Sequence, residues 1–323
     1  MGRYTQLLTA VLLLAAVIAI KISLVPDDAV PTVPAQAAVA SAHPMATEAG
    51  LDILAAGGNA FDAAVAVSAT LAVVEPYSSG MGGGGFWLLH RASDAHTVMI
   101  DGRERAPLAA HRDMYLDDNG EVAPGLSVNG PLAAGIPGQA AALVHLAERY
   151  GRLPLKKTLA PAIAAARKGF PVTPHYRRMA QFRLEALRAS PEAAAIFLHD
   201  NDVPPLGHVI RQPDLATSLK LLAAGGRDVF YDGPLAQALV EGVREAGGIW
   251  QLRDLREYTV VERRPIVFDY RGYRITSVPP PSSGGVALAT LFNILDGFDL
   301  DALPPVTRVH LKVEAMRRAY YDR

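Results

Sequence analysis

The most unusual segment that could bind a ligand is a glycine-rich loop, Gly80–Gly85, with the sequence GMGGGG. It satisfies the pattern G-x-G-x-x-G of dinucleotide-binding loops, but that pattern needs a strand before it and a helix after it. Here a helical pattern precedes the loop, a strand pattern follows, and the Lys-Ser/Thr of a P-loop is missing. Each glycine costs conformational entropy on folding, so four consecutive glycines need a structural reason. Either a second backbone segment passes close to the loop or the loop N–H groups face a ligand, and we favour the close backbone approach.

An arginine at the end of an expected strand is a second candidate. The segment Asp101–Pro107, DGRERAP, directly follows the apolar run 97–101. A guanidinium at a strand end can present two parallel N–H groups to a carboxylate. The alternative is an internal ion pair of Arg103 with Asp101 or Glu104, and spacing alone favours this alternative.

A proline-rich turn carries the paired hydroxyls of Ser282 and Ser283 in the segment 279–285, PPPSSGG. A serine nucleophile needs a positioned base, and no local pattern supplies one. The turn leads into an expected helix, so we interpret one of the two serines as its N-cap.

The histidines do not form a recognisable metal or catalytic site. His310 and Glu314 lie one helical turn apart with Arg317 on the same face, but no second ligand pair accompanies them. This favours a solvated charged stripe. His43 and His90 stand alone, which is typical of structural histidines. No metal and no cofactor are predicted.

The composition excludes several classes of protein. The chain has 323 residues, of which 50% are hydrophobic and 20% charged, which excludes general disorder and fibrous repeats. Its 31 Lys and Arg against 32 Asp and Glu give a net charge of −1, so nucleic acid is not an expected partner. It has no cysteine, which excludes disulfides, thiol nucleophiles and thiolate zinc sites.

The N-terminal region predicts export. The apolar run Leu7–Ile20 fits a signal-peptide core, and residues 7–25 taken together reach the length of a marginal membrane anchor. We therefore expect residues 1–25 to be a signal peptide or membrane anchor and residues 26–40, which are rich in Pro and Ala, to be a linker. Ala35-Gln36-Ala37 has the shape of a cleavage site but lies far from the apolar run, so cleavage stays open.

The remaining residues, 41–323, predict one α+β domain whose helices come in pairs and whose strands pair mostly as hairpins. Gly57 and Gly58 end a first helix, and Asn59 with Asp62 forms the capping pattern of a second, which is apolar on nearly all sides and therefore expected to be buried. The expected helices span 44–56, 60–75, 139–149, 159–168, 175–198, 214–224, 235–246, 286–296 and 306–321. The expected strands span 86–90, 97–101, 263–270 and 273–279, the last two joined at Arg271-Gly272.

Nine motifs, in order, resemble the large-subunit part of the γ-glutamyltranspeptidases. They cover the chain from about Ala38 to its last residue without a large gap. No single motif is decisive, but the set is specific because all nine occur in the family's order. The motifs lie at 43–66, 73–89, 101–107, 135–143, 148–155, 161–173, 247–258, 270–288 and 310–323.

The resemblance implies a fold, an activity and one site residue. The fold would be part of the αββα sandwich of an N-terminal-nucleophile hydrolase, in which a threonine freed by self-cleavage attacks the γ-glutamyl amide of glutathione and passes the acyl group to water or an amino acid. The Arg of the family's RE-x-AP segment grips the α-carboxylate of the γ-glutamyl group, and that position here is Arg103. Bacterial members are commonly periplasmic, which agrees with the expected export.

The chain departs from the family pattern because it holds no Thr-Thr pair, so no catalytic residue is predicted within it. The nucleophile is expected C-terminal to Arg323, in a missing small subunit, and the chain alone is expected to be inactive. We also expect the isolated chain to fold poorly, with the apolar helix 60–75 left without its cover. The alternatives are a non-catalytic truncated homologue or partner subunit, and the same scaffold acting as a β-lactam acylase or on poly-γ-glutamate.

Overall fold

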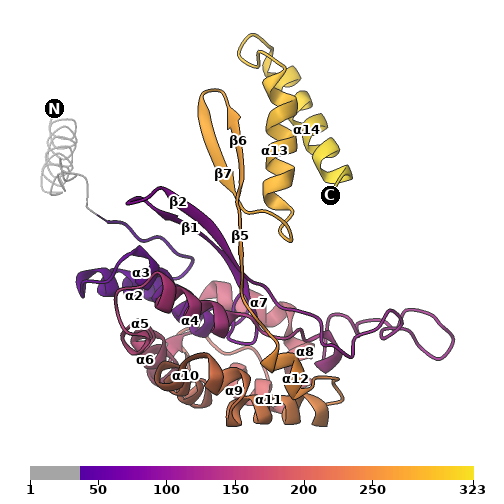
Figure 1. The fold of residues 1–323 in the computed structure, drawn as a ribbon. Helices are drawn as coiled ribbons and strands as arrows, with labels where there is room; N and C mark the ends of the chain where they lie inside the picture. Colours follow the sequence, from indigo (N-terminus) through magenta and orange to yellow (C-terminus); the bar gives the residue numbers. More distant parts are fainter. Residues whose placement is uncertain (1–36) are drawn as a thin grey trace, which may run out of the picture. The chain divides into compact units, whose positions relative to one another are not determined.

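The structure is a computed structural model that describes residues 37–323 (Figure 1). The expected signal or anchor segment, residues 1–25, and most of the expected linker, residues 26–40, lie outside the described residues. Residues Val39–Arg323 form one compact unit. Within the described part of the chain, no helix is both long enough and apolar enough to cross a membrane.

The first two helices confirm the local capping signals. Helix α2 spans Pro44–Ala55 and is followed by Gly57 in the left-handed region, with a φ of 89°. Helix α3 spans Ala60–Val74, and its start carries the predicted capping box. The Asn59 side chain accepts from the N–H of Asp62, and the Asp62 carboxylate accepts from the N–H of Asn59.

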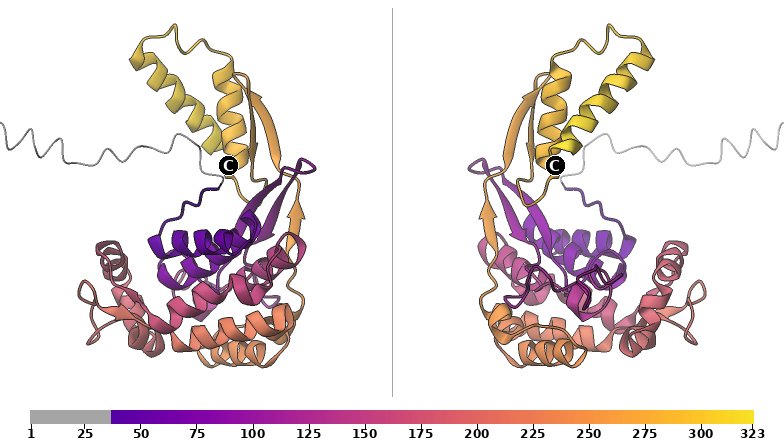
Figure 2. Two further views of the ribbon diagram at one scale, coloured as in Figure 1. Left: turned by 90° about the vertical axis from the view of Figure 1, so that its left-hand side faces the viewer. Right: turned by 90° about the vertical axis from the view of Figure 1, so that its right-hand side faces the viewer.

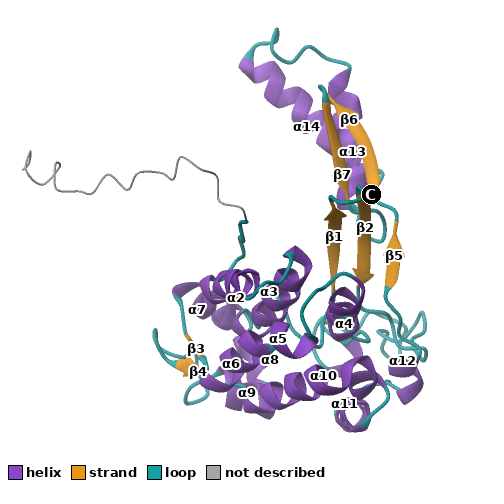
Figure 3. Ribbon diagram, turned by 60° about the vertical axis from the view of Figure 1, so that its left-hand side comes forward, coloured by secondary structure: helices purple, strands orange, loops and turns teal. Residues whose placement is uncertain are grey.

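A three-stranded antiparallel sheet follows the glycine loop, with the strand order β1–β2–β5 (Figure 3). Strands β1 (Gly85–Arg91) and β2 (His96–Gly102) form the predicted hairpin, in which Phe86 pairs with Asp101. Strand β5 (Val261–Arg263) pairs with β2 from far along the chain, in the register Asp101 to Val261. Two two-stranded sheets, β3–β4 and β6–β7, complete the strands of the described residues.

The segment between β2 and β5 is mostly helical, and together with α2, α3, β1, β2 and β5 it forms what we call the helical body. Its helices are α4 (Gln139–Arg149), α5 (Leu155–Thr158), α6 (Ala160–Lys168), α7 (Pro174–Phe182), α8 (Leu184–Arg188), α9 (Pro191–Phe197), α10 (Pro213–Tyr231), α11 (Pro234–Glu245) and α12 (Leu252–Arg256), with a 3-10 turn at Pro131–Ala133 and the short strands β3 (Phe170–Pro171) and β4 (Val209–Ile210).

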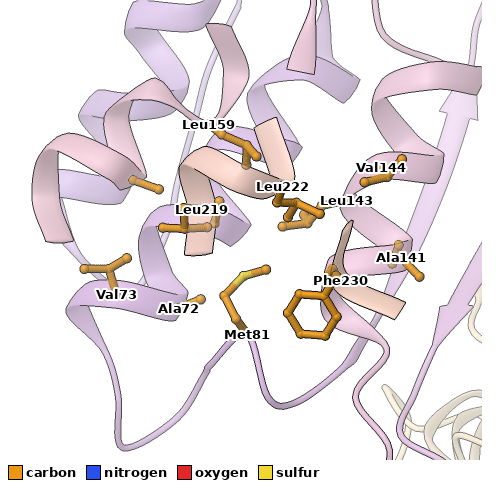
Figure 4. Packing of buried hydrophobic residues seen from close by; sticks show 14 of the residues in the cluster. Ala72, Val73, Met81, Ala141, Leu143, Val144, Leu159, Leu219, Leu222 and Phe230 are labelled. Carbon is orange, nitrogen blue, oxygen red and sulfur yellow. The ribbon is translucent and has the colours of Figure 1, made fainter. Parts of the chain in front are cut away.

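The main hydrophobic core lies within the helical body (Figure 4). Helix α3 packs against α2, α4 and α6, and α10 packs against α4 and α6. Helix α3 is therefore covered by other parts of the same chain, and its Val65 and Ala69 are fully buried. The expectation that the helix 60–75 would be left without its cover is wrong, because these neighbouring helices take that role.

The last four elements form what we call the C-terminal lobe: β6 (Ile266–Tyr270), β7 (Tyr273–Ser277), α13 (Gly284–Asp296) and α14 (Pro305–Tyr321). The predicted turn joins β6 to β7, with Arg271 and Gly272 both in the left-handed region. Helix α13 packs on the hairpin and on α14, and both views of Figure 2 show the four elements together. A small core of its own is built around Leu295, Leu300 and Ala315.

Two expected helices differ from those observed. The segment 175–198 is not one helix but three short ones, α7 to α9, and the last break falls at Ser190, which precedes Pro191 and leaves the helical region. The expected helix 214–224 continues past Gly225 to Tyr231. Gly226 nevertheless breaks its regularity, with a φ of 62° and a ψ of −150°, so the segment is two helices joined at a kink.

Candidate functional site

Arg103 stands directly after the last residue of β2, as the sequence predicts for an arginine at a strand end. Its side chain is exposed, and the guanidinium carbon lies 5.9 Å from the centroid of the Phe86 ring. The internal ion pair with Asp101 or Glu104, which spacing favoured, does not form among residues 37–323. Asp101 instead pairs with Arg263, at 2.8 Å from Nε to Oδ2. The Arg103 guanidinium thus has no ion-pair partner in the described part of the chain, and its side-chain neighbour is the Phe86 ring.

The backbone of Arg103 is held on both sides by buried side chains. Its N–H donates to Oδ1 of Asp101 at 3.0 Å, and its carbonyl oxygen accepts from the hydroxyl of Tyr258 at 2.8 Å. Asp101 is 7% exposed and Tyr258 1% exposed. Asp101 also binds Arg263 of β5, so β5 and the segment after α12 are both tied to the end of β2, the first through Asp101 and the second through Arg103.

Three glycines allow the backbone to cross closely beside Arg103. A Cβ on Gly84 would lie 2.3 Å from the carbonyl oxygen of Gly102, and one on Gly138 would lie 2.0 Å from the same oxygen. The carbonyl of Gly83 also accepts from the N–H groups of Gly138 and Gln139, both at 2.9 Å, and so satisfies the start of α4. The predicted role of the glycine loop, close approach of a second backbone segment, is confirmed.

A buried methionine anchors the glycine loop in the main core. Met81 is 8% exposed and belongs to the same cluster as Val73 of α3 and Leu222 and Phe230 of α10. Figure 4 shows its side chain among these residues. The loop is therefore fixed by packing at Met81 and by backbone contacts at Gly83 and Gly84, which makes the support of Arg103 rigid.

Two stacked tyrosines complete the crossing. The rings of Tyr231 and Tyr258 are 5.6 Å apart between centroids and inclined by 18°. The Tyr231 hydroxyl donates to the Pro137 carbonyl at 2.8 Å and accepts from the N–H of Ala141 at 3.1 Å. Burial raises the pKa of Tyr258 to about 12, so its hydroxyl stays protonated and acts as a donor at neutral pH.

A polar cluster toward the C-terminal end of α4 ties β5 to this helix. Glu262 of β5 accepts from the Tyr150 hydroxyl and lies 2.8 Å from Nε2 of His145. Burial acts to raise the pKa of the Glu262 carboxyl, but the hydrogen bonds from His145 and Tyr150 outweigh it, so the pKa lies below its usual value. Burial, followed by the bond to Glu262, raises the pKa of Tyr150 to about 12.

The two serines of the proline-rich turn, Ser282 and Ser283, lie at the start of α13. Ser283 occupies the N-cap position of α13, but its hydroxyl makes no capping bond and lies 2.6 Å from Nε of Arg323. Ser282 Oγ accepts from the Gly284 N–H at 3.4 Å, so the predicted serine cap is only approximated by Ser282.

The histidine interpretations are supported in detail. Glu314 pairs with Arg317 at 2.6 Å on the exposed face of α14, as a solvated charged stripe predicts. His43 caps α2, because its Nδ1 accepts from the N–H of Met45, and His90 lies 2.8 Å from the Thr97 hydroxyl. Among residues 37–323, no group of three or more His, Asp or Glu side chains is placed to hold a metal ion.

Sequence reasoning missed the residues that support Arg103. Tyr258 and Gly138 lie within the motifs 247–258 and 135–143, and Arg263 is the first residue of the expected strand 263–270, but no local pattern links them to Arg103. Each contacts the 101–103 segment across a large sequence separation, 155 residues for Tyr258 and 162 residues for Arg263. The single usable signal was the unexplained glycine at 138, which indicates close backbone approach.

The fold and the site together define a mixed helix-and-sheet protein that presents an arginine on a rigid backbone crossing. The profile of the gamma-glutamyltranspeptidase family matches residues 46–323. The chain is 41% identical to a glutathione hydrolase proenzyme of Pseudomonas sp. (strain A14), over 88% of the chain and 50% of that relative. Its fold matches the crystal structure of Helicobacter pylori gamma-glutamyltranspeptidase with a TM-score of 0.87 at 37% identity, covering 90% of this chain and 84% of that one. The chain belongs to the gamma-glutamyltranspeptidase family.

Two features of these relatives bear on function. The chain spans about half the length of the curated relatives it matches. One relative carries a different activity in its name, the acylase ACY 1 proenzyme of Pseudomonas sp. (strain V22). It is 40% identical over 88% of this chain and 52% of its own length. The family thus includes both glutathione hydrolases and acylases.

Proposed function

We propose that this chain is the large-subunit part of a γ-glutamyltransferase that hydrolyses glutathione. The proposal is supported by the family membership and by relatives named glutathione hydrolase proenzymes. In this proposal residues 41–323 form part of an αββα sandwich of the N-terminal-nucleophile hydrolase type, which the other half of the enzyme completes.

The observation that carries the proposal is the exposed guanidinium of Arg103, which has no ion-pair partner among residues 37–323 and stands on a backbone held by hydrogen bonds on both sides. A planar guanidinium binds a carboxylate through two parallel N–H bonds and discriminates by geometry as well as charge. In the proposed enzyme Arg103 receives the α-carboxylate of the γ-glutamyl group, which orients the γ-carbonyl for attack. Asp101, Tyr258 and the glycine crossing keep the base of this side chain in place.

The nucleophile of the proposed reaction is a threonine in the other half of the enzyme, beyond Arg323. Its hydroxyl attacks the γ-carbonyl while its own α-amine takes the proton, and that proton then passes to the leaving amine of the peptide. Water or an amino acid next attacks the γ-glutamyl ester and releases the threonine. We therefore expect the 323-residue chain alone to show no γ-glutamyl hydrolysis, and turnover by the purified chain would contradict this arrangement.

The C-terminal lobe offers the remaining half a surface to pack on. Helix α14 leaves Val306, Val309 and Tyr321 exposed at 81%, 60% and 90%. Apolar surface of this kind marks interaction sites. The missing small subunit is the partner we propose for it, and glutathione is the proposed small-molecule substrate. Export to the periplasm, with residues 1–25 as signal peptide or anchor, is part of the same proposal.

The test of the proposed function is Arg103→Ala in the full-length enzyme, meaning this chain together with the other half that its relatives carry. Leaving the substrate carboxylate without its charged partner should cost about 2–4 kcal/mol of donor binding. The measurement is KM and kcat for γ-glutamyl-p-nitroanilide. Arg91→Ala is the matched control, because Arg91 lies at the end of β1 and pairs with Asp94 at the surface. Unchanged kinetics in Arg103→Ala would contradict the assignment.

A second candidate function is hydrolysis of a β-lactam side-chain amide, which is supported by the fold match to a cephalosporin acylase of Bacillus halodurans, with a TM-score of 0.77 at 31% identity. The scaffold and the expected nucleophile would be the same, and only the acyl group would differ. A comparison of kcat/KM for glutathione and for glutaryl-7-aminocephalosporanic acid separates the two. A preference for glutathione that depends on Arg103 supports the first function, and a preference for the cephalosporin supports the second.

A further inference from the structure

A buried tyrosine from a distant part of the chain holds the backbone of Arg103. Tyr258 follows α12, and its hydroxyl donates to the Arg103 carbonyl at 2.8 Å. We propose that Tyr258 is a positioning residue that fixes the point from which the Arg103 side chain reaches a bound γ-glutamyl carboxylate. This inference rests on the proposed function of Arg103 and adds a determinant of donor affinity that does not itself touch the substrate.

The ring of Tyr258 has no freedom to move away from Arg103. One face stacks on Tyr231, and the guanidinium carbon of Arg105 lies 5.1 Å from the Tyr258 ring centroid. Arg105 is fixed in turn, because it donates to the Thr259 carbonyl at 2.8 Å. The Tyr258 hydroxyl is therefore directed at the carbonyl oxygen of Arg103.

The space around the Tyr258 hydroxyl is closed on its other side. A Cβ on Gly138 would lie 2.0 Å from this oxygen, so the glycine is needed for the tyrosine to reach Arg103. With Asp101 binding the Arg103 N–H and Tyr258 its carbonyl, both polar groups of the peptide backbone at residue 103 are fixed by side chains. A bidentate guanidinium tolerates little displacement, so fixing its backbone favours carboxylate binding.

Tyr231 is a matched comparison within the same stacked pair. Like Tyr258 it is fully buried and keeps its hydroxyl hydrogen-bonded, but its partners are the Pro137 carbonyl and the Ala141 N–H at the start of α4. Loss of either hydroxyl leaves a backbone carbonyl without its partner, and loss of the Tyr231 hydroxyl also frees the Ala141 N–H. Tyr231→Phe should therefore lower stability at least as much as Tyr258→Phe. Only the Tyr258 hydroxyl contacts Arg103.

The experiment compares Tyr258→Phe with Tyr231→Phe in the full-length enzyme. For Tyr258→Phe we expect KM for γ-glutamyl-p-nitroanilide to rise about tenfold with kcat changed less than about twofold, because donor binding is lost in the ground state and the transition state alike. For Tyr231→Phe we expect a fall in Tm at least as large as that of Tyr258→Phe, with KM within about twofold of the wild type. An unchanged KM in Tyr258→Phe, or an equal rise in both variants, would overturn the proposal.

A second donor separates positioning from general damage. The 4-aminobutyryl p-nitroanilide keeps the amine but lacks the α-carboxylate, so Arg103 has nothing to hold. The ratio of kcat/KM for γ-glutamyl-p-nitroanilide to kcat/KM for the 4-aminobutyryl donor does not depend on how much enzyme is folded. We expect this ratio to fall about tenfold in Tyr258→Phe, and an unchanged ratio would contradict the inference. If Arg103→Ala changes the ratio while Tyr258→Phe does not, only the inference fails. If neither does, the proposed role of Arg103 fails as well.

Discussion

The helical body and the C-terminal lobe differ in how far they bury the apolar side chains of their helices. Helix α3 in the body is apolar on nearly all sides, and neighbouring helices bury it, with Val65 and Ala69 fully inaccessible. Helix α14 in the lobe buries only Ala315 and Ala319 below the surface and leaves Val306 and Tyr321 largely exposed. A helix that is apolar on nearly all sides can thus be covered within its own chain, whereas a more polar helix can leave apolar side chains exposed.

The same contrast separates the support of the site from the surface for assembly. Arg103 stands on the helical body, where Met81 and the glycine crossing lie inside or beside the main core. The lobe has only a small core of its own. The body thus supplies a rigid base for the proposed carboxylate-binding arginine, and the lobe supplies the exposed apolar surface proposed for the other half of the enzyme.

The largest expected effect tests the rigidity of the crossing. Gly84→Ala would place a Cβ 2.3 Å from the Gly102 carbonyl oxygen, against backbone that cannot yield cheaply. We expect the chain to lose about 4 kcal/mol of unfolding free energy, at the upper end for a single substitution. Gly82→Ala, in the same loop but with nothing within 4 Å of the added Cβ, is the control. Urea unfolding followed by circular dichroism measures both, and equal stability of the two variants would contradict the crossing.

The second prediction compares the body and the lobe with one residue type. Leu222→Ala removes a side chain that is 1% exposed in the main core, and should cost about 3 kcal/mol. Leu288→Ala in α13 removes one that is 40% exposed and should cost less than about 0.5 kcal/mol. The shift in the urea midpoint measures both. Similar costs at the two positions would mean that the lobe is as tightly packed as the body.

The smallest effect concerns pH. The pKa of Glu262 lies below its ordinary value of 4.5, so its ionised form is favoured in the folded state. Its contribution to stability is therefore present above pH 4.5 and is lost as the pH falls through the lowered pKa. With the side chain one-third exposed, we expect this contribution to be less than about 1 kcal/mol. It should vanish in Glu262→Gln.

The lobe provides the control for the pH prediction. The bond to Arg317 lowers the pKa of Glu314, but this carboxylate lies in an exposed ion pair that salt screens. We would measure urea midpoints in 1 M salt between pH 3 and 6. Their dependence on pH should differ from that of the wild type in Glu262→Gln and should match it in Glu314→Gln. If the urea midpoint of Glu262→Gln varied with pH in the same way as that of the wild type, the ionised Glu262 carboxylate would not stabilise the contact between β5 and α4.

Local features of the fold were predictable because the interactions that determine them lie within a few residues. The capping box of Asn59 and Asp62 and the turn at Arg271-Gly272 are examples. The pairing of β5 with β2 and the bond from Tyr258 to Arg103 were not, because the sequence carries no local trace of a contact made across more than a hundred residues. Arg103 itself was singled out from its place at a strand end, but its spacing favoured an ion pair with Asp101, a residue that binds Arg263 instead.

The most direct test of the central claim is a crystal structure of the full-length enzyme with bound L-glutamate. We predict the α-carboxylate on the Arg103 guanidinium through two N–H bonds of about 2.7–2.9 Å, with the Tyr258 hydroxyl still on the Arg103 carbonyl. A glutamate whose α-carboxylate is held by other residues, with the Arg103 side chain turned away, would contradict the account.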